Sequence, residues 1–279
     1  MSDLHIDLNH FETYEIDTLI KCLKDQKVSH LHIAGDISNH YFIDTKPFLR
    51  KLSKEVKVTY NLGNHDMLDL EDDLIDNLDF QVTNLGSKTL LAFHGWYDYS
   101  YSDETLDKIL KRKKQFWFDR RLKRLGTDPE ICQRSLKKLD NILSKLNTRN
   151  LIVAMHFVPH SRFTMTHERF KPFNAYLGSE QFHQIFVKHG VKDVVFGHAH
   201  RSYGTVTIDG VSYHSRPLGY RREWDLTIDF VSNHPELNPT GTWNLSKRYN
   251  LVKKRPEFLE YEKKELVNEF LSSMTLFDL

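Results

Sequence analysis

Histidine, aspartate and asparagine are concentrated in short clusters, and most of these clusters follow a strand-like run of apolar residues. The tetrapeptide Gly-Asn-His-Asp at residues 63–66 comes soon after such a run at 56–60, and Gly-His-Ala-His at 197–200 follows another. Carboxylate, imidazole and amide groups at the ends of strands could bind metal ions or transfer protons. A single residue of these types also forms turns or caps helices, so one cluster alone would indicate an ordinary loop.

The clusters become informative together, because five segments end or begin with residues of this kind. They supply two carboxylates, one amide oxygen and four imidazoles, and we expect them to converge on one edge of a sheet. Nitrogen and oxygen donors without thiolate suit Mn²⁺, Fe or Zn²⁺. Seven donors exceed the needs of one tetrahedral ion and suit two ions that share a carboxylate. The candidate ligands are Asp3, His5, Asp36, Asn64, His156, His198 and His200.

The elements that must position these residues alternate between strands and helices, which predicts βαβ units. After about residue 200 the pattern changes to antiparallel strands around the turn at 209–210, continuing to about 230, and the chain then has loops before a last helix. The expected helices lie at about 13–26, 48–52, 68–78, 179–189 and 256–271. The expected strands lie at about 28–34, 56–60, 80–83, 89–93, 151–155 and 191–196.

Residues 101–148 interrupt this pattern with two long, charged helical segments at about 103–125 and 129–146, the second capped by Asp128. We therefore expect a single domain over 1–279 that contains a helical cap insertion at 101–148. A C-terminal extension of loops and a helix is expected at 231–279.

The order of the motifs resembles that of the calcineurin-like metallophosphoesterase family, namely D-x-H, G-D, G-N-H followed by D or E, H, and G-H-x-H. Every motif is present, in order, between residues 3 and 200. The resemblance implies an α/β fold, a four-layer α-β-β-α sandwich of two packed mixed β-sheets flanked by helices.

The resemblance also implies a dinuclear metal centre, with Mn²⁺ (manganese) expected first and Fe or Zn²⁺ as alternatives. A hydroxide bridging the ions would attack a phosphoester, His65 would assist the leaving group, and Asp66 would orient the ring of His65. One ion would be held by Asp3, His5 and His200, the other by Asn64, His156 and His198, with Asp36 between them.

Two points in the motifs stay open. His94 also ends a strand-like run and competes with His156 as the ligand of the fourth motif, although His156 follows the more strongly apolar strand. Family members have a full strand before D-x-H, whereas only Met1 and Ser2 precede Asp3 here. The sequence therefore suggests a start further upstream or a truncated first strand.

Composition sets limits on the remaining choices. Lys plus Arg (39) nearly equals Asp plus Glu (38), so net charge does not indicate a polyanionic partner. We expect no transmembrane segment and no secretory signal, and two cysteines without pair spacing indicate a reducing compartment, hence a cytoplasmic protein.

The substrate is not specified by the motifs. Basic residues between 108 and 124 are interleaved with Phe116, Trp117 and Phe118. This is either a solvated helix face or a cap that attracts an anion, such as a phosphorylated small molecule, a nucleotide, a nucleic acid or an anionic lipid. A nuclease and a catalytically silent binding scaffold are the alternatives to a general phosphoesterase. The intact ligand set and His65 favour an enzyme.

Overall fold

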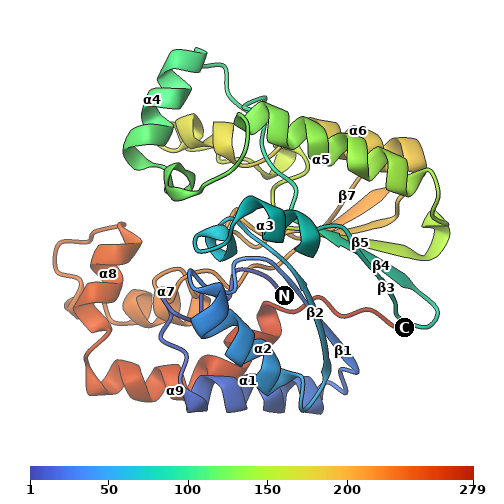
Figure 1. Cartoon of the computed structure of the whole chain (residues 1–279). Helices are drawn as coiled ribbons and strands as arrows, with labels where there is room; N and C mark the ends of the chain where they lie inside the picture. The colour runs from blue at the N-terminus through green and yellow to red at the C-terminus, as the bar shows by residue number, and fades with distance from the viewer.

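The protein is described by a computed structural model that covers residues 1–279 and contains two β-sheets between layers of helices (Figure 1). The smaller sheet has two parallel strands, and the larger has six strands in the order β3-β4-β5-β6-β8-β7. In the larger sheet β4, β5, β6 and β8 are parallel, while β3 and β7 are antiparallel edge strands. The strands are β1 (His30–Ala34), β2 (Lys57–Asn61), β3 (Gln81–Asn84), β4 (Thr89–Phe93), β5 (Leu151–Met155), β6 (Asp193–Val195), β7 (Gly204–Ile208) and β8 (Val211–Ser215).

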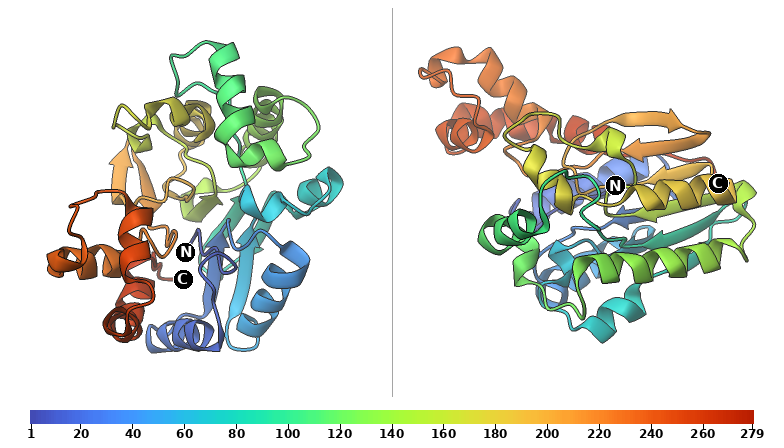
Figure 2. Two further views of the ribbon diagram at one scale, coloured as in Figure 1. Left: turned by 90° about the vertical axis from the view of Figure 1, so that its left-hand side faces the viewer. Right: turned by 90° about the horizontal axis from the view of Figure 1, so that it is seen from above.

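Helices cover the outer faces of both sheets, with α5 and α6 outside the larger sheet and α1 and α2 outside the smaller one (Figures 1 and 2). This arrangement confirms the expected sandwich, although the smaller sheet is parallel rather than mixed. The helices are α1 (Thr13–Asp25), α2 (Lys46–Leu52), α3 (Asp72–Leu78), α4 (Leu106–Phe116), α5 (Asp128–Leu143), α6 (Glu180–His189), α7 (Asp225–Asn233), α8 (Leu245–Val252) and α9 (Pro256–Ser272). Short 3-10 or π-helical turns are η1 (Tyr41–Thr45), η2 (His65–Met67), η3 (Phe118–Arg121), η4 (Thr148–Asn150), η5 (Ser161–Phe163), η6 (Lys171–Tyr176) and η7 (Pro235–Leu237).

Two large hydrophobic cores and a small cluster of four buried residues hold these layers. The larger core, of 33 buried residues, packs the six-stranded sheet against α5 and α6. The second, of 22 buried residues, packs the small sheet against α1, α2, α7 and α9. Every residue of β5 is buried, as expected for an apolar strand with parallel neighbours on both sides.

The first residues of the chain run beside β1. The backbone N–H of Ala34 donates to the carbonyl of Met1 (2.8 Å), and the N–H of Asp3 donates to the carbonyl of Gly35 (3.0 Å). The terminal ammonium group of Met1 donates to the carbonyl of His32 (3.1 Å). This short paired stretch carries Asp3 to the end of β1.

The sequence-based elements differ from the structure in several places, among them helix α8, which lies where only loops were expected. The first insertion helix ends at Phe116, because the following turn η3 runs inward to the site described below. The N-cap of α5 is Thr127, which forms a capping box with Glu130, whereas Asp128 is already helical. The expected strand near 225–230 is helix α7, whose first turn is capped by Glu269, a contact that the local sequence does not contain.

None of the helices combines the length and apolar character that crossing a membrane requires. Cys22 and Cys132 are free and buried. The cytoplasmic location stays a prediction.

Candidate metal centre

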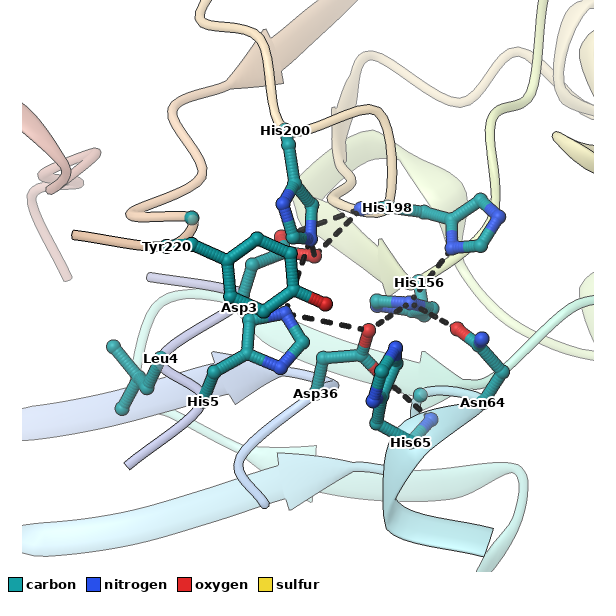
Figure 3. Close-up of polar contacts among 12 residues, drawn as sticks. Asp3, Leu4, His5, Asp36, Asn64, His65, His156, His198, His200 and Tyr220 are labelled. Atoms are coloured by element: carbon teal, nitrogen blue, oxygen red, sulfur yellow. Dashed lines mark hydrogen bonds and ion pairs between the residues drawn. The ribbon is translucent and has the colours of Figure 1, made fainter. Parts of the chain in front are cut away.

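The seven predicted ligands lie together at the carboxyl ends of the strands (Figure 3). The N-terminal stretch, the loops after β1 and β2, and the loops after β5 and β6 each contribute to the cluster. Five of the seven have positive φ angles between 42° and 68°, a conformation that is costly for residues with a Cβ and that clusters at functional sites. These five are Asp3, His5, Asp36, His198 and His200.

The potential donor atoms form two groups that share Asp36. In the first group, His5 Nε2 lies 3.0 Å from His200 Nε2, and His200 Nε2 lies 3.3 Å from Asp3 Oδ1. In the second group, His156 Nε2 lies 3.3 Å from Asp36 Oδ2 and 3.2 Å from Asn64 Oδ1. His198 Nδ1 lies 3.2 Å from His156 Nε2. The grouping is the one that the resemblance implies.

Glycines allow these loops to approach one another. A Cβ atom on Gly63 would lie 2.2 Å from Asp36 Oδ1, and one on Gly197 would lie 2.3 Å from Asp3 Oδ2. Any larger residue at either position would displace a carboxylate of the cluster.

Two histidines are held by backbone carbonyl groups in the tautomer that suits a metal ligand. His156 Nδ1 lies 3.0 Å from the carbonyl oxygen of Ala34, and His198 Nε2 lies 3.2 Å from that of Tyr176. Carbonyl oxygens only accept hydrogen bonds, so these outer nitrogens carry the protons. The inner nitrogens therefore face the cluster and are the atoms that a metal ion would bind.

His200 is held in the same way by a carboxylate. Its Nδ1 lies 2.8 Å from Glu223 Oε2, an arrangement that orients ligating histidines in many metal sites. His5 differs, because its buried Nδ1 atom has no hydrogen-bond partner. Several imidazole nitrogens and carboxylate oxygens thus lie within about 3.3 Å of one another, and this donor set fits a pair of divalent cations.

The pKa values of the buried ligands show that the centre favours a bound positive charge. Burial lowers the pKa of His156, but the neighbouring carboxylate of Asp36 outweighs burial and raises the pKa to about 9. Burial raises the pKa of Asp3, and the contact with His200 reverses this effect and lowers the pKa to about 2. A cation that binds here would therefore displace a proton from His156.

His65 lies beside the ligands and is held by residues other than the expected one. Its Nδ1 atom lies 2.9 Å from Asn39 Oδ1, and Asn39 Nδ2 donates to Asp7 Oδ2 (2.7 Å). The ring of Phe118 stacks on the His65 ring with centroids 3.7 Å apart. Neither Asn39 nor Phe118 was expected here, and the only sequence signal for Asn39 is its place three residues after Asp36.

The expected contact between Asp66 and the ring of His65 is absent, so that part of the prediction was wrong. Asp66 is fully buried, and its carboxylate accepts hydrogen bonds only from backbone N–H groups. A carboxylate among four such donors joins the loop after β1 to the loop after β2. The donors are Asp36 (2.7 Å), Gly63 (2.8 Å), Ile37 (2.9 Å) and Ser38 (3.1 Å).

His94, the competitor of His156, does not turn its ring into the cluster. Its backbone N–H donates to Asp79 Oδ1 (2.9 Å), and its Nε2 atom lies 3.3 Å from Asp79 Oδ2. Its backbone carbonyl accepts the N–H of His156 (3.1 Å). His94 therefore supports the strand end, and the structure brings His156 to the cluster.

Away from the predicted ligands, another cluster of histidine and carboxylate side chains contains His160, Glu180 and His183. Their potential donor atoms lie within 4.8 Å of one another. Here the N–H of Arg162 donates to His160 Nδ1 (2.9 Å), so His160 Nε2 must carry the proton. That atom lies 3.1 Å from Glu180 Oε1 and donates to it. The hydrogen bonds within this cluster satisfy His160 and Glu180, whereas the cluster of predicted ligands keeps a buried His5 Nδ1 atom without a partner.

Several basic residues of the insertion are paired with carboxylates. Lys113 donates to both carboxylate oxygens of Asp128 (2.7 and 2.6 Å), and Arg124 pairs with Asp72 (2.5 Å). Arg112 pairs with Glu104. These ion pairs reduce the positive charge available to a polyanion.

Comparison with known proteins bears on the fold and the family of the chain. The chain resembles the phosphopantetheinyl hydrolase of Mycobacterium tuberculosis with a TM-score of 0.61 and 19% identity, over 80% of this chain and 89% of that one. A second solved structure has a TM-score of 0.51 and 11% identity, over 74% of this chain and 86% of that one. No curated protein sequence matches the chain. Residues 1–202 match the family described as calcineurin-like phosphoesterase. The chain therefore belongs to the calcineurin-like phosphoesterase family.

Proposed function

We propose that the protein hydrolyses a phosphoester, mono- or diester, at a dinuclear metal centre. The observation that carries this proposal is the convergence of imidazole nitrogens, carboxylate oxygens and an amide oxygen from five segments, with Asp36 common to both groups. Asp3, His5 and His200 would hold one ion and Asn64, His156 and His198 the other, with Asp36 between them. The donor set suits Mn²⁺, with Fe and Zn²⁺ as alternatives.

Two such ions, when bound, would supply Lewis acidity toward the phosphoryl oxygens and lower the pKa of an attacking water molecule. The chain's own residues supply the remaining groups. Asp36 and Asp3 balance the charge of the ions. Glu223 and the carbonyl oxygens of Ala34 and Tyr176 keep the ligand rings in position.

His65 is the residue placed to serve the leaving group. Asn39 donates to Asp7, so its Oδ1 atom accepts the Nδ1–H of His65. Nε2 is then the atom that faces the departing oxygen, and it donates a proton when the ring is in the imidazolium form, after which the ring is neutral and keeps its Nδ1–H bond to Asn39. The backbone N–H of His65 donates to Asp36 Oδ1 (2.9 Å), which ties the proton donor to the shared carboxylate.

The substrate class that we propose is a phosphorylated small molecule or nucleotide. The ion pairs of Lys113, Arg112 and Arg124 do not favour a nucleic acid. The hydrolase with the similar fold is named for a phosphopantetheinyl group, and we include such esters in the test.

The test is hydrolysis of p-nitrophenyl phosphate and bis-p-nitrophenyl phosphate by protein loaded with Mn²⁺, Fe²⁺ or Zn²⁺. Nucleotides and phosphopantetheinyl esters form the second panel. We expect metal-dependent turnover that His65→Ala abolishes without loss of bound metal. Protein that holds two ions but hydrolyses nothing in either panel would instead be a binding scaffold.

A further inference from the structure

The insertion reaches the metal centre through one short turn rather than through its long helices. Helix α4 projects from the body (Figure 2), and Trp117 and the 3-10 turn η3, which follow it, lead the chain back to the site. The Trp117 ring stacks on Tyr176 (4.9 Å between centroids), whose backbone carbonyl holds His198. Phe118 stacks on His65. Two consecutive aromatic residues therefore anchor the turn beside Asp119.

Asp119 makes a direct contact with a predicted ligand. Its Oδ1 atom accepts a hydrogen bond from Asn64 Nδ2 (2.8 Å), and its Oδ2 atom accepts one from Trp117 Nε1 (2.9 Å). Asp119 and Asn64 are 3% and 2% exposed, so water cannot replace either contact.

The chemistry of the pair decides which atom Asn64 offers to the centre. An asparagine amide has one end that donates and one that accepts, and either end could face the ligands. An ionised carboxylate only accepts, so Asp119 selects the NH₂ end. The carbonyl oxygen of Asn64 is left facing His156, at 3.2 Å from its Nε2 atom.

We propose that Asp119 is a positioning residue of the metal centre, which fixes Asn64 with its carbonyl oxygen toward the ion. The inference rests on the proposed dinuclear centre. It gives the insertion a role in the centre, because one of its residues completes the surroundings of one ligand. Its carboxylate also adds negative charge behind that ligand, which favours a cation.

The test is the affinity of each of the two Mn²⁺ ions, measured by calorimetry and by metal content after dialysis. Asp119→Asn keeps the volume of the side chain but can donate as well as accept, so Asn64 is free to turn over. We expect several-fold weaker binding of one ion in Asp119→Asn and about 10- to 100-fold weaker binding in Asp119→Ala, with the other ion nearly unaffected.

Asp128→Asn is the matched control. Asp128 is another buried carboxylate of the insertion, and it accepts hydrogen bonds from Trp96 and Lys113 away from the ligands. We expect this variant to keep both ions. A double-mutant cycle adds a second readout, since Asp119→Asn should have no further effect on metal affinity in an Asn64→Ala background.

Wild-type affinity for both ions in folded Asp119→Asn would overturn the inference. Equal losses in Asp119→Asn and Asp128→Asn, or additive losses in the cycle, would also overturn it, because they would indicate a general structural effect. Wild-type protein that binds two ions but cleaves no phosphoester would contradict the proposed function and leave the role of Asp119 intact.

Discussion

Asn39 Oδ1 lies 2.9 Å from Nδ1 of His65, and this contact orients the ring that we propose serves the leaving group. Asp7 in turn holds Asn39 through the amide nitrogen and the backbone N–H. Because a carboxylate cannot donate, the chain from Asp7 to His65 has only one arrangement of protons. The orientation and the tautomer of His65 are thus set by residues from two other loops.

The first prediction concerns Asn39→Ala. The ring of His65 would lose its only hydrogen-bonded partner, and we expect turnover to fall about 10- to 100-fold while bound metal stays unchanged. Steady-state kinetics with good and poor leaving groups check this, and the loss should be greater for the poor ones. Equal losses for all leaving groups would mean that Asn39 acts on something other than proton transfer.

The second prediction separates Asp66 from Asn39. Asp66→Ala would leave four buried backbone N–H groups without an acceptor, so we expect a loss of about 3 kcal/mol or more in the free energy of unfolding. Urea denaturation measures this, with Asp73→Ala on the exposed side of α3 as the control. A stable Asp66→Ala protein with impaired turnover would favour a catalytic role for Asp66.

The third prediction compares Asp36 with His65. Asp36 lies in both ligand groups, so Asp36→Asn should weaken binding of both ions. His65→Ala should retain both ions and lose turnover. Metal content after dialysis distinguishes the two variants, and a His65→Ala protein without metal would show that His65 is itself a ligand.

The fourth prediction is a pH dependence of stability away from the metal centre. Burial raises the pKa of Glu269 to about 7, with Asp225 and Asp229 adding to the effect, although two backbone N–H groups oppose it. The folded state therefore binds the proton more tightly than the unfolded state, whose ordinary value is 4.5. Stability from this group is highest below pH 4.5 and falls by about 3 kcal/mol as pH rises to 7.

Glu269→Gln removes the ionisation and keeps one acceptor for the first turn of α7. We expect its free energy of unfolding to vary less than that of the wild type between pH 5 and 7.5. The histidines titrate in both proteins. Their contribution therefore cancels when the free energy of unfolding of the variant is subtracted from that of the wild type at each pH. Parallel profiles would show that Glu269 titrates normally in the folded protein.

The ligand residues were predictable because their types and order recur at strand ends, where the fold must bring them together. Their partners were not, since Asn39, Glu223 and Asp119 come from loops whose positions depend on packing over long sequence separations. Asp66 illustrates the limit. Adjacent to His65 in sequence, it faces the loop after β1 instead.

The insertion illustrates a second limit. Charge and periodicity predicted its helices, and these features are local. The break after Phe116 is not local, because it depends on the contacts of Trp117, Phe118 and Asp119 with the body of the protein.

The two hydrophobic cores meet at the ligand cluster. Leu4 and Ile37, beside the ligands Asp3 and Asp36, belong to the smaller core, whereas Phe157 and Phe196, near His156 and His198, belong to the larger one. Bound ions would therefore add cross-links between two parts of the molecule with different cores, which Tyr60 also joins. At an ion concentration 100 times the dissociation constant, each ion would add about 2.7 kcal/mol to the stability of the folded state. Chelation should then loosen the junction between the sheets before it loosens either core.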